Sequence, residues 1–265
     1  MESRITQICL ICLNLLDRQK KKSGRPEKLK KEAYLKEILY VLRTGIQWKE
    51  LRSELHWSTY YKKFCKWANA GVFRTSFELL HKIMRKGKYL KESSYKKLYI
   101  DATMIKNVKG KDLIGVNHYD RGKKGSKISL LVTKEGIPLN LEMVSSNVHD
   151  LTAFKTQIEK IKIKFMGSLI IGDKGYVSKK LKESLEKDQI NLITPHKKNS
   201  KNKNSKNKNS DENRELLRDR SLVENVFSWI QQRRRIRLRY EVHSKYYLEF
   251  YYLCLIDIIF KKKDI

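Results

Sequence analysis

The stretch Leu98-Tyr-Ile-Asp-Ala-Thr103 decides the fold class, together with Ser168-Leu-Ile-Ile-Gly-Asp173 later in the chain. Each is a short run rich in aliphatic, aromatic or β-branched residues, which is typical of a buried strand. Each also carries an aspartate, and burying a charged group without a partner is costly. Metal coordination is a common solution, so Asp101 and Asp173 are candidate metal ligands. For either aspartate alone, the alternative is a residue that caps a neighbouring turn.

Further strands and helices surround these two strands. Residues 127–144 have the pattern of a β-hairpin, with a turn that contains Glu135-Gly136. Periodicity then predicts two more helices and one more strand, at residues 150–161, 178–187 and 190–194. The order is strand, two-stranded hairpin, helix, strand, helix and strand. This order predicts an α/β domain with a mixed sheet and helices.

The first 90 residues have a different pattern and read as helical. Apolar residues between Tyr34 and Leu42 recur with the 3.6-residue period, and Gly45 is placed to end that helix. Ser58 or Thr59 is a candidate N-cap for the next helix. Short basic helices with tight turns favour a helix-turn-helix-like DNA-binding module, and a plain helical bundle is the alternative. We therefore expect an all-α domain over residues 1–90 and a second domain over residues 95–265.

The C-terminal third holds a third candidate carboxylate. A Lys/Asn/Ser-rich tract at about residues 197–213 has nothing to bury and is expected to be a disordered insert. After it, residues 219–238 read as one long helix. Arg220, Glu224 and Gln231 share a face of that helix, where the glutamate could bind a metal and the others a phosphate. The alternative is a solvent-exposed Arg220–Glu224 salt bridge.

The charge balance points to a polyanionic partner. The 265 residues include 59 Lys plus Arg against 29 Asp plus Glu, a formal charge of +30. Nucleic acids and anionic membranes are the common polyanions. No apolar run approaches the roughly 18 residues of a membrane-spanning helix, so nucleic acid is the expected partner.

The N-terminal apolar stretch and its cysteines have two readings each. Residues 5–16 are expected to form an amphipathic helix, with a signal peptide as the alternative. Cys9 and Cys12 form a CxxC pair without a second pair to complete a zinc site, so we place both on the apolar face of that helix. Nothing in the sequence suggests disulfides, which favours a reducing compartment.

At the three carboxylates the sequence resembles the DDE transposases of the insertion-sequence-five group. The resemblance runs from about residue 24 to the C-terminal helix and rests on motifs in a shared order. These are RTGIQWKEL (43–51), WSTYYKKFCKW (57–67), YIDATMIK (99–106), GSKISLLVTKEGIPL (125–139), SNVHD (146–150), GDKGY (172–176) and RSLVENVFSWI (220–230).

The resemblance implies an RNase H-like catalytic domain with Asp101, Asp173 and Glu224 as the catalytic triad. Hard divalent cations prefer oxygen ligands, and two such ions can activate the attacking oxygen and stabilise the leaving oxygen of a phosphodiester. We therefore expect two Mg²⁺ ions, with Mn²⁺ as a substitute. In the family signature around the glutamate, the Tyr and Lys positions hold Leu217 and Gln231 here.

The expected activity is metal-dependent strand cleavage and strand transfer at the terminal inverted repeats of a mobile element. The expected partners are double-stranded DNA, both transposon ends and target, and further copies of the chain, at least a homodimer in the transpososome. No membrane contact is expected. The candidate DNA contacts are Arg220, Gln231, Lys174, His149, Arg43, Lys62, Lys63 and Lys66.

For one of these candidates, His149, capping of the following helix is the alternative to a site role. For the whole chain, the alternatives are a decayed or domesticated copy that binds DNA without cutting it, and a basic RNA-binding protein. The expected location follows the host: cytoplasm or nucleoid in a bacterium, nucleus or viral factory for a eukaryotic or viral origin, and not secreted.

Overall fold

The structure is a computed structural model that describes residues 2–18, 27–118, 120–161, 166–195 and 217–263. The Lys/Asn/Ser-rich insert expected at 197–213 lies outside these ranges. The chain forms two compact units. Unit 1 comprises Met1–Tyr89, Asn107–Asp112 and Trp229–Ile265, and unit 2 comprises Leu90–Lys106 and Leu113–Ser228.

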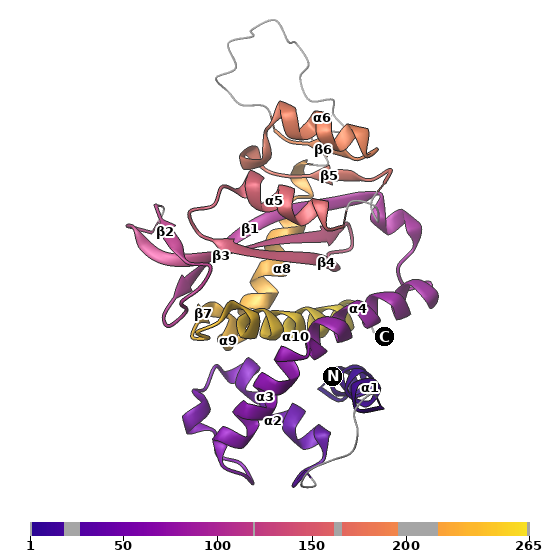
Figure 1. The fold of residues 1–265 in the computed structure, drawn as a ribbon. Coiled ribbons are helices and arrows are strands. Elements are labelled where there is room, and N and C mark those ends of the chain that lie inside the picture. Colours follow the sequence, from indigo (N-terminus) through magenta and orange to yellow (C-terminus); the bar gives the residue numbers. More distant parts are fainter. Residues whose placement is uncertain (1, 19–26, 119, 162–165, 196–216, 264–265) are drawn as a thin grey trace, which may run out of the picture. The chain divides into compact units, whose positions relative to one another are not determined.

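Unit 2 is built on a mixed β-sheet (Figure 1). Its strand order is β2-β3-β1-β5-β6, and β4 also pairs with β3. The strand β1 is antiparallel to β3 and parallel to β5, which is in turn parallel to β6. The bounds are β1 Lys97–Asn107, β2 Gly115–Asn117, β3 Lys123–Thr133, β4 Pro138–Ser145, β5 Leu169–Ile171 and β6 Asn191–Ile193. The expected hairpin is confirmed, with Gly136 in the left-handed region at φ 72°.

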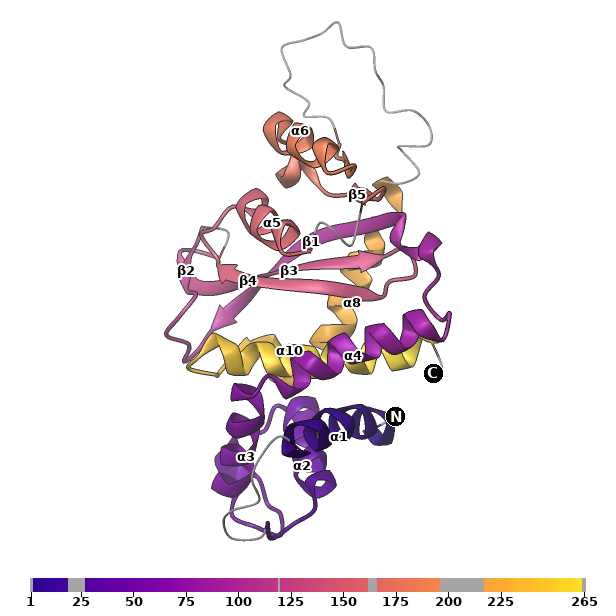
Figure 2. The ribbon, with the colours of Figure 1, turned by 45° about the vertical axis from the view of Figure 1, so that its right-hand side comes forward.

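Helices cover both faces of this sheet (Figures 1 and 2). The helices α5 (Asp150–Glu159) and α6 (Lys179–Lys187) pack on one face, where Leu98 and Ile100 of β1 join a core with Phe154. Side chains alternate along a strand, so Tyr99 points to the other face. There its hydroxyl donates to Asp219 Oδ2 at 3.4 Å, two residues before α8 (Ser221–Gln231). Asp101 has the same parity as Tyr99 and therefore faces the start of α8.

Unit 1 is helical, and the C-terminal helix α10 (Ser244–Lys263) packs against the N-terminal helices of the unit. The stacked rings of Phe64 and Phe250, with centroids 4.4 Å apart, join α3 (Trp57–Asn69) to α10. The expected helix end at Gly45 is confirmed, since this glycine has φ 70° and its N–H donates to Val41 O. The other elements are α1 Glu2–Arg18, α2 Lys31–Thr44, the 3₁₀ turn Trp48–Glu50, α3 Trp57–Asn69, α4 Val72–Lys86, α9 Arg234–Arg237 and β7 Leu238–Arg239.

Three further expectations concern the first helix, the N-cap of α3 and membrane-spanning helices. Residues 5–16 are helical within α1, and Cys9 and Cys12 are buried on its apolar face. The N-cap of α3 is not Ser58 or Thr59 but His56, whose Nδ1 accepts from the Ser58 N–H at 3.4 Å. Among the described residues no helix has the length and hydropathy to cross a membrane.

The single long helix expected at 219–238 is wrong. The helix α8 stops at Gln231, and the short helix α9 and strand β7 follow. The break places two arginines in unit 1 against buried carboxylates: Arg233 pairs with Asp257, and Arg235 pairs with Glu241 at 2.7 Å. Burying a charge without a partner is costly, so these pairs favour a chain that turns over one that continues as a helix.

The two compact units differ from the expected division of the chain. Residues 229–265 lie in unit 1 with the N-terminal helices, and residues 107–112 also belong to unit 1. We expected a DNA-binding domain over residues 1–90 and a catalytic domain over residues 95–265. The functions of these two domains remain a prediction.

Candidate active site

Asp101 in β1 and Asp173, two residues beyond the end of β5, lie at matching positions beside two adjacent parallel strands. The register of β1 and β5 pairs Lys97 with Leu169 and Tyr99 with Ile171. Asp101 follows Tyr99 by two residues, and Asp173 follows Ile171 by two residues. Adjacent strands are about 4.8 Å apart, so the fold sets the two aspartates side by side at one end of the parallel pair.

Each aspartate accepts one backbone hydrogen bond. Asp101 Oδ1 accepts from its neighbour Ala102 N–H at 2.8 Å, and Asp173 Oδ1 accepts from the Gly175 N–H at 2.7 Å. The second bond caps the 3₁₀ turn Lys174–Tyr176. The turn-capping alternative for Asp173 is therefore present in the structure. It occupies one carboxylate oxygen and does not exclude a ligand role for the other.

The environment of Asp101 disfavours its negative charge. Burial raises the pKa of Asp101 to about 6, the Ala102 N–H opposes this rise, and the charges of Asp173 and Glu224 add to it. The positive charge of Arg220 acts in the opposite direction. A divalent cation would relieve the same repulsion, because an opposite charge favours the ionised carboxylate.

Glu224 lies on α8 and pairs with Arg220. Its Oε1 is 3.3 Å from Arg220 Nη2, and the Glu224 side chain is 56% exposed. This is the salt bridge that the sequence offered as the alternative to a metal ligand. Across the part of the chain that the structure describes, no three His, Cys, Asp or Glu side chains are gathered closely enough to hold a metal ion.

A further carboxylate, Asp150, lies beside Asp173 and was not singled out from the sequence. A Cβ atom on Gly175 would be 2.9 Å from Asp173 Oδ1 and 3.3 Å from Asp150 Oδ2. Gly175 therefore allows both carboxylates to approach the turn closely. In the sequence, Asp150 stands at the end of the SNVHD motif.

Buried Lys127 is the partner of Asp150. Its Nζ is 2.6 Å from Asp150 Oδ1 and donates to Val148 O at 2.6 Å. A lysine on an inward-facing position of β3 is the signal that could have identified this pair. The ring of Tyr176 lies in the hydrophobic core of unit 2. Burial raises the pKa of Tyr176, and the negative charges of Asp150, Asp101 and Asp173 raise it further.

The two remaining candidate DNA contacts of unit 2 differ in their interactions within the protein. His149 is the N-cap of α5, where its Nδ1 accepts from the Leu151 N–H at 3.2 Å. This is the capping role considered as the alternative to a site role. Lys174 is exposed in the turn after Asp173. A role for either residue in DNA binding remains a prediction.

The candidates of unit 1 also differ. Arg43, Lys62, Lys66 and Gln231 are exposed. Lys63 is engaged within the protein: its Nζ is 2.5 Å from Glu27 Oε1 and lies over the ring of Tyr34 at 4.9 Å. Its position favours a structural role over contact with a phosphate.

Two of the three candidate carboxylates, Asp101 and Asp173, are placed to bind a hard divalent cation. Asp101 and Asp173 offer carboxylate oxygens at adjacent positions, and the raised pKa of Asp101 reflects the charge that a cation would neutralise. Glu224 influences Asp101 electrostatically but is turned to Arg220. Its carboxylate would have to leave Arg220 to complete a three-carboxylate site.

Comparison with protein families agrees with the motifs in both units. A family model described as a transposase DDE domain matches residues 92–256, and one for transposases of the IS4/5 family matches residues 11–77. No curated protein matches the sequence.

Two solved transposase structures match this chain to different degrees. A piggyBac transposase synaptic complex with hairpin DNA has a TM-score of 0.50 and 9% identity, covering 95% of this chain and 70% of that chain. A Mos1 strand transfer complex has a TM-score of 0.34 and 10% identity, covering 95% of this chain and 84% of that chain. The expected RNase H-like α/β fold with an N-terminal helical region is confirmed.

Proposed function

The chain belongs to the DDE transposases of the IS4/5 group, and we propose that it cuts and joins DNA at the ends of a mobile element with Asp101, Asp173 and Glu224 as its catalytic carboxylates. One observation carries this proposal. Asp101 and Asp173 follow the paired residues of two adjacent parallel strands by the same number of positions, which supports a shared site at the end of this strand pair.

Divalent metal ions are the proposed cofactors. Asp101 and Asp173 would hold them, with Glu224 joining when its side chain leaves Arg220. Bound Mg²⁺ or Mn²⁺ would supply activation of the attacking oxygen and charge stabilisation of the leaving oxygen. Release of Glu224 would also free the Arg220 guanidinium, which is well suited to bind a phosphate through paired hydrogen bonds.

The proposed partner is double-stranded DNA, and at least two copies of the chain would act together because two transposon ends must be paired. The formal charge of +30 supports this partner. Neutralised phosphates release counterions, so binding should weaken steeply with salt. In unit 1, exposed Lys62 and Lys66 on α3 are the candidates for contacts to the transposon ends.

The test uses purified full-length protein and DNA that carries the terminal inverted repeats of the element. We expect strand cleavage in Mg²⁺ or Mn²⁺ and none in EDTA. Cleavage of a scrambled-end duplex at the same rate would overturn the assignment to transposon ends. Cleavage that persists in EDTA would overturn the metal mechanism.

A second candidate function is DNA binding without cleavage. The pairing of Glu224 with Arg220 favours it, as does the uncharged Gln231 at the Lys position of the family signature. Specific, salt-sensitive binding to the inverted repeats without cleavage in either metal would support this alternative over the active enzyme.

A further inference from the structure

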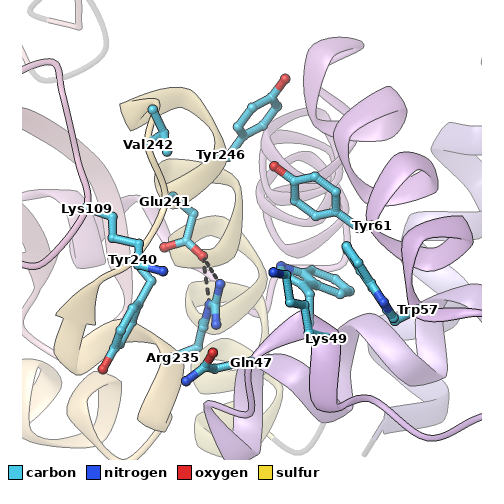
Figure 3. A pocket seen from close by; sticks show the side chains of 11 residues that line it. Gln47, Lys49, Trp57, Tyr61, Lys109, Arg235, Tyr240, Glu241, Val242 and Tyr246 are labelled. Atoms are coloured by element: carbon cyan, nitrogen blue, oxygen red, sulfur yellow. Dashed lines mark hydrogen bonds and ion pairs between the residues drawn. The ribbon is translucent and has the colours of Figure 1, made fainter.

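Unit 1 contains a cavity of about 270 Å³ that the proposed catalysis does not use. It is shown in Figure 3. It is lined by segments distant in sequence, from residues 47–61, Lys109 and residues 235–246. Its volume is just below the roughly 300–1,000 Å³ of typical small-molecule pockets, so it suits one small ring system.

Aromatic side chains form one wall of this cavity. Trp48 and Tyr61 lie with their ring centroids 5.5 Å apart, and Trp57 adds a third ring to the lining. Tyr61 is 37% exposed, so this wall can be reached from solvent. Such rings offer stacking surfaces to a planar ligand, and bases of single-stranded nucleic acid stack on them without sequence preference.

A buried carboxylate oxygen gives the cavity a specific acceptor. Glu241 is 7% exposed, and its Oε1 receives Arg235 Nε at 2.7 Å. Its Oε2 is buried and has no hydrogen-bond partner among the described residues. In Figure 3 this oxygen is turned away from Arg235, on the side where Lys109 lies. A buried acceptor without a partner is costly, so it marks a position for a donor group of a ligand.

Two exposed lysines complete the lining. Lys49 and Lys109 carry positive charge at the cavity, and within the described ranges neither has an ion-pair partner. The occupant therefore combines a flat ring, an N–H donor and an attached anion. These are the features of a nucleotide whose base carries an amino group.

We propose that this cavity binds a single unpaired nucleobase of DNA, stacked against Trp57 and Tyr61, with an amino group that donates to Glu241 Oε2. Lys49 and Lys109 bind the adjacent phosphates. Cytosine, adenine and guanine carry such an amino group, and thymine does not. The inference rests on the proposed function only in naming DNA as the source of the base.

The first experiment uses the full chain without metal and follows its tryptophan fluorescence. The probes are dCMP, dTMP and deoxyribose 5-phosphate, which has the same phosphate but no base. We expect quenching by dCMP at the lowest concentration, by dTMP at a higher one, and none by the sugar phosphate. Trp57→Phe should remove most of the quenching. The matched control Trp67→Phe, at a buried tryptophan that does not line the cavity, should retain it.

The second experiment separates a DNA base from a free nucleotide. Two duplexes are compared that differ only in one unpaired residue, cytosine or an abasic sugar. The cytosine duplex should bind about fivefold or more tightly, which is the lower end of what one base–aromatic stack contributes. Glu241→Gln should reduce the preference for dCMP over dTMP. Tyr61→Ala, at an exposed ring, should weaken binding of the cytosine duplex without unfolding the protein.

Equal affinity for the two duplexes would overturn the assignment to DNA, and quenching by dCMP alone would then indicate a free nucleotide. Equal quenching by dCMP and the sugar phosphate would overturn a base site altogether. Neither measurement requires cleavage, so failure here leaves the proposed catalysis untouched.

Discussion

Lys127 Nζ lies 2.6 Å from Asp150 Oδ1, and this ion pair joins strand β3 to the first residue of α5 inside unit 2. The lysine side chain is 6% exposed and the aspartate side chain is 34% exposed. Asp150 also lies beside the turn that holds Asp173. The ion pair therefore holds Asp150 next to the turn that contains Asp173, although neither Lys127 nor Asp150 belongs to the proposed triad.

Removing one partner of this pair should destabilise unit 2 unequally. Asp150→Asn leaves a buried ammonium without its counter-ion and should cost about 3–5 kcal/mol. Lys127→Met leaves a carboxylate that water can still reach, so it should cost less. Urea unfolding at neutral pH measures both, and the double variant should recover part of the loss. Glu183→Gln breaks an exposed pair with Lys179 and is the matched control, with a cost of about 0–1 kcal/mol. Equal losses in the three single variants would contradict this account.

Bound divalent cations should stabilise unit 2. A ligand that binds only the folded state at 100 times its Kd adds about 2.7 kcal/mol. We expect Mn²⁺ to raise the Tm of the full chain by several degrees, and Asp101→Asn or Asp173→Asn to remove most of that rise. Glu183→Gln, which alters an exposed carboxylate away from the site, should retain it. An unchanged rise in either Asn variant would take that aspartate out of the metal site.

Buried Glu249 should make unit 1 less stable as the pH rises. Its Oε2 accepts from the N–H groups of Phe73 and Arg74 at the start of α4, at 3.1 and 3.3 Å. Burial raises the pKa of Glu249 from 4.5 to about 7, against the opposing effect of these N–H groups and of Arg74. A raised carboxyl pKa means that the folded state holds the proton more tightly than the unfolded state. Its stabilising contribution is therefore complete below pH 4.5 and is lost as the pH rises through 7.

Glu249→Gln should remove this pH dependence. Between low and high pH, the free energy of unfolding should fall by at most roughly 3 kcal/mol more in the wild type than in the variant. The reason is that each pH unit between the two pKa values corresponds to about 1.4 kcal/mol. Urea unfolding at pH 5 and pH 8 measures it. Glu183→Gln, at an exposed carboxylate that pairs with Lys179, is the control. If wild type and Glu249→Gln change in parallel between these pH values, Glu249 is not the titrating group.

The lysines of α3 should separate DNA binding from folding. Lys62 and Lys66 are exposed, so Lys62→Gln with Lys66→Gln should weaken binding to an inverted-repeat duplex and leave the Tm unchanged. The slope of log affinity against log salt should fall by about 0.9 for each lost phosphate contact. Lys63→Gln should instead lower the Tm, because it breaks the pair with Glu27. A loss of affinity from Lys63→Gln alone, at an unchanged Tm, would reverse this assignment.

The sequence predicted the elements whose cause is local. The turn at Gly136, the helix end at Gly45, the strand that contains Asp101 and the short strand before Asp173 follow from local patterns, and the structure contains all of them. The end of α8 at Gln231 could not be predicted in this way. It depends on Asp257 and Glu241, which lie farther along the chain and bind Arg233 and Arg235 only in the folded unit.

The candidate site, like the fold, was predicted from the sequence only where its cause is local. Two strand-like runs followed by a carboxylate identified the two aspartates, because such a run can be recognised from a few neighbouring residues. The Lys127–Asp150 pair joins residues that are 23 positions apart, and the salt bridge of Glu224 was visible only as an alternative. Periodicity places residues on a face of a helix, but it does not decide which partner a side chain takes.

In the proposed mechanism, Asp101, Asp173 and Glu224 act together in strand cleavage. The most direct measurement is cleavage of an inverted-repeat duplex in Mg²⁺ by Asp101→Asn, Asp173→Asn and Glu224→Gln, with DNA affinity measured on the same proteins. Each change keeps the shape of the side chain and removes one negative charge. We expect loss of cleavage in all three variants, with DNA binding close to that of the wild type. Cleavage retained by Glu224→Gln would show that Glu224 is only the salt-bridge partner of Arg220, and would contradict the account.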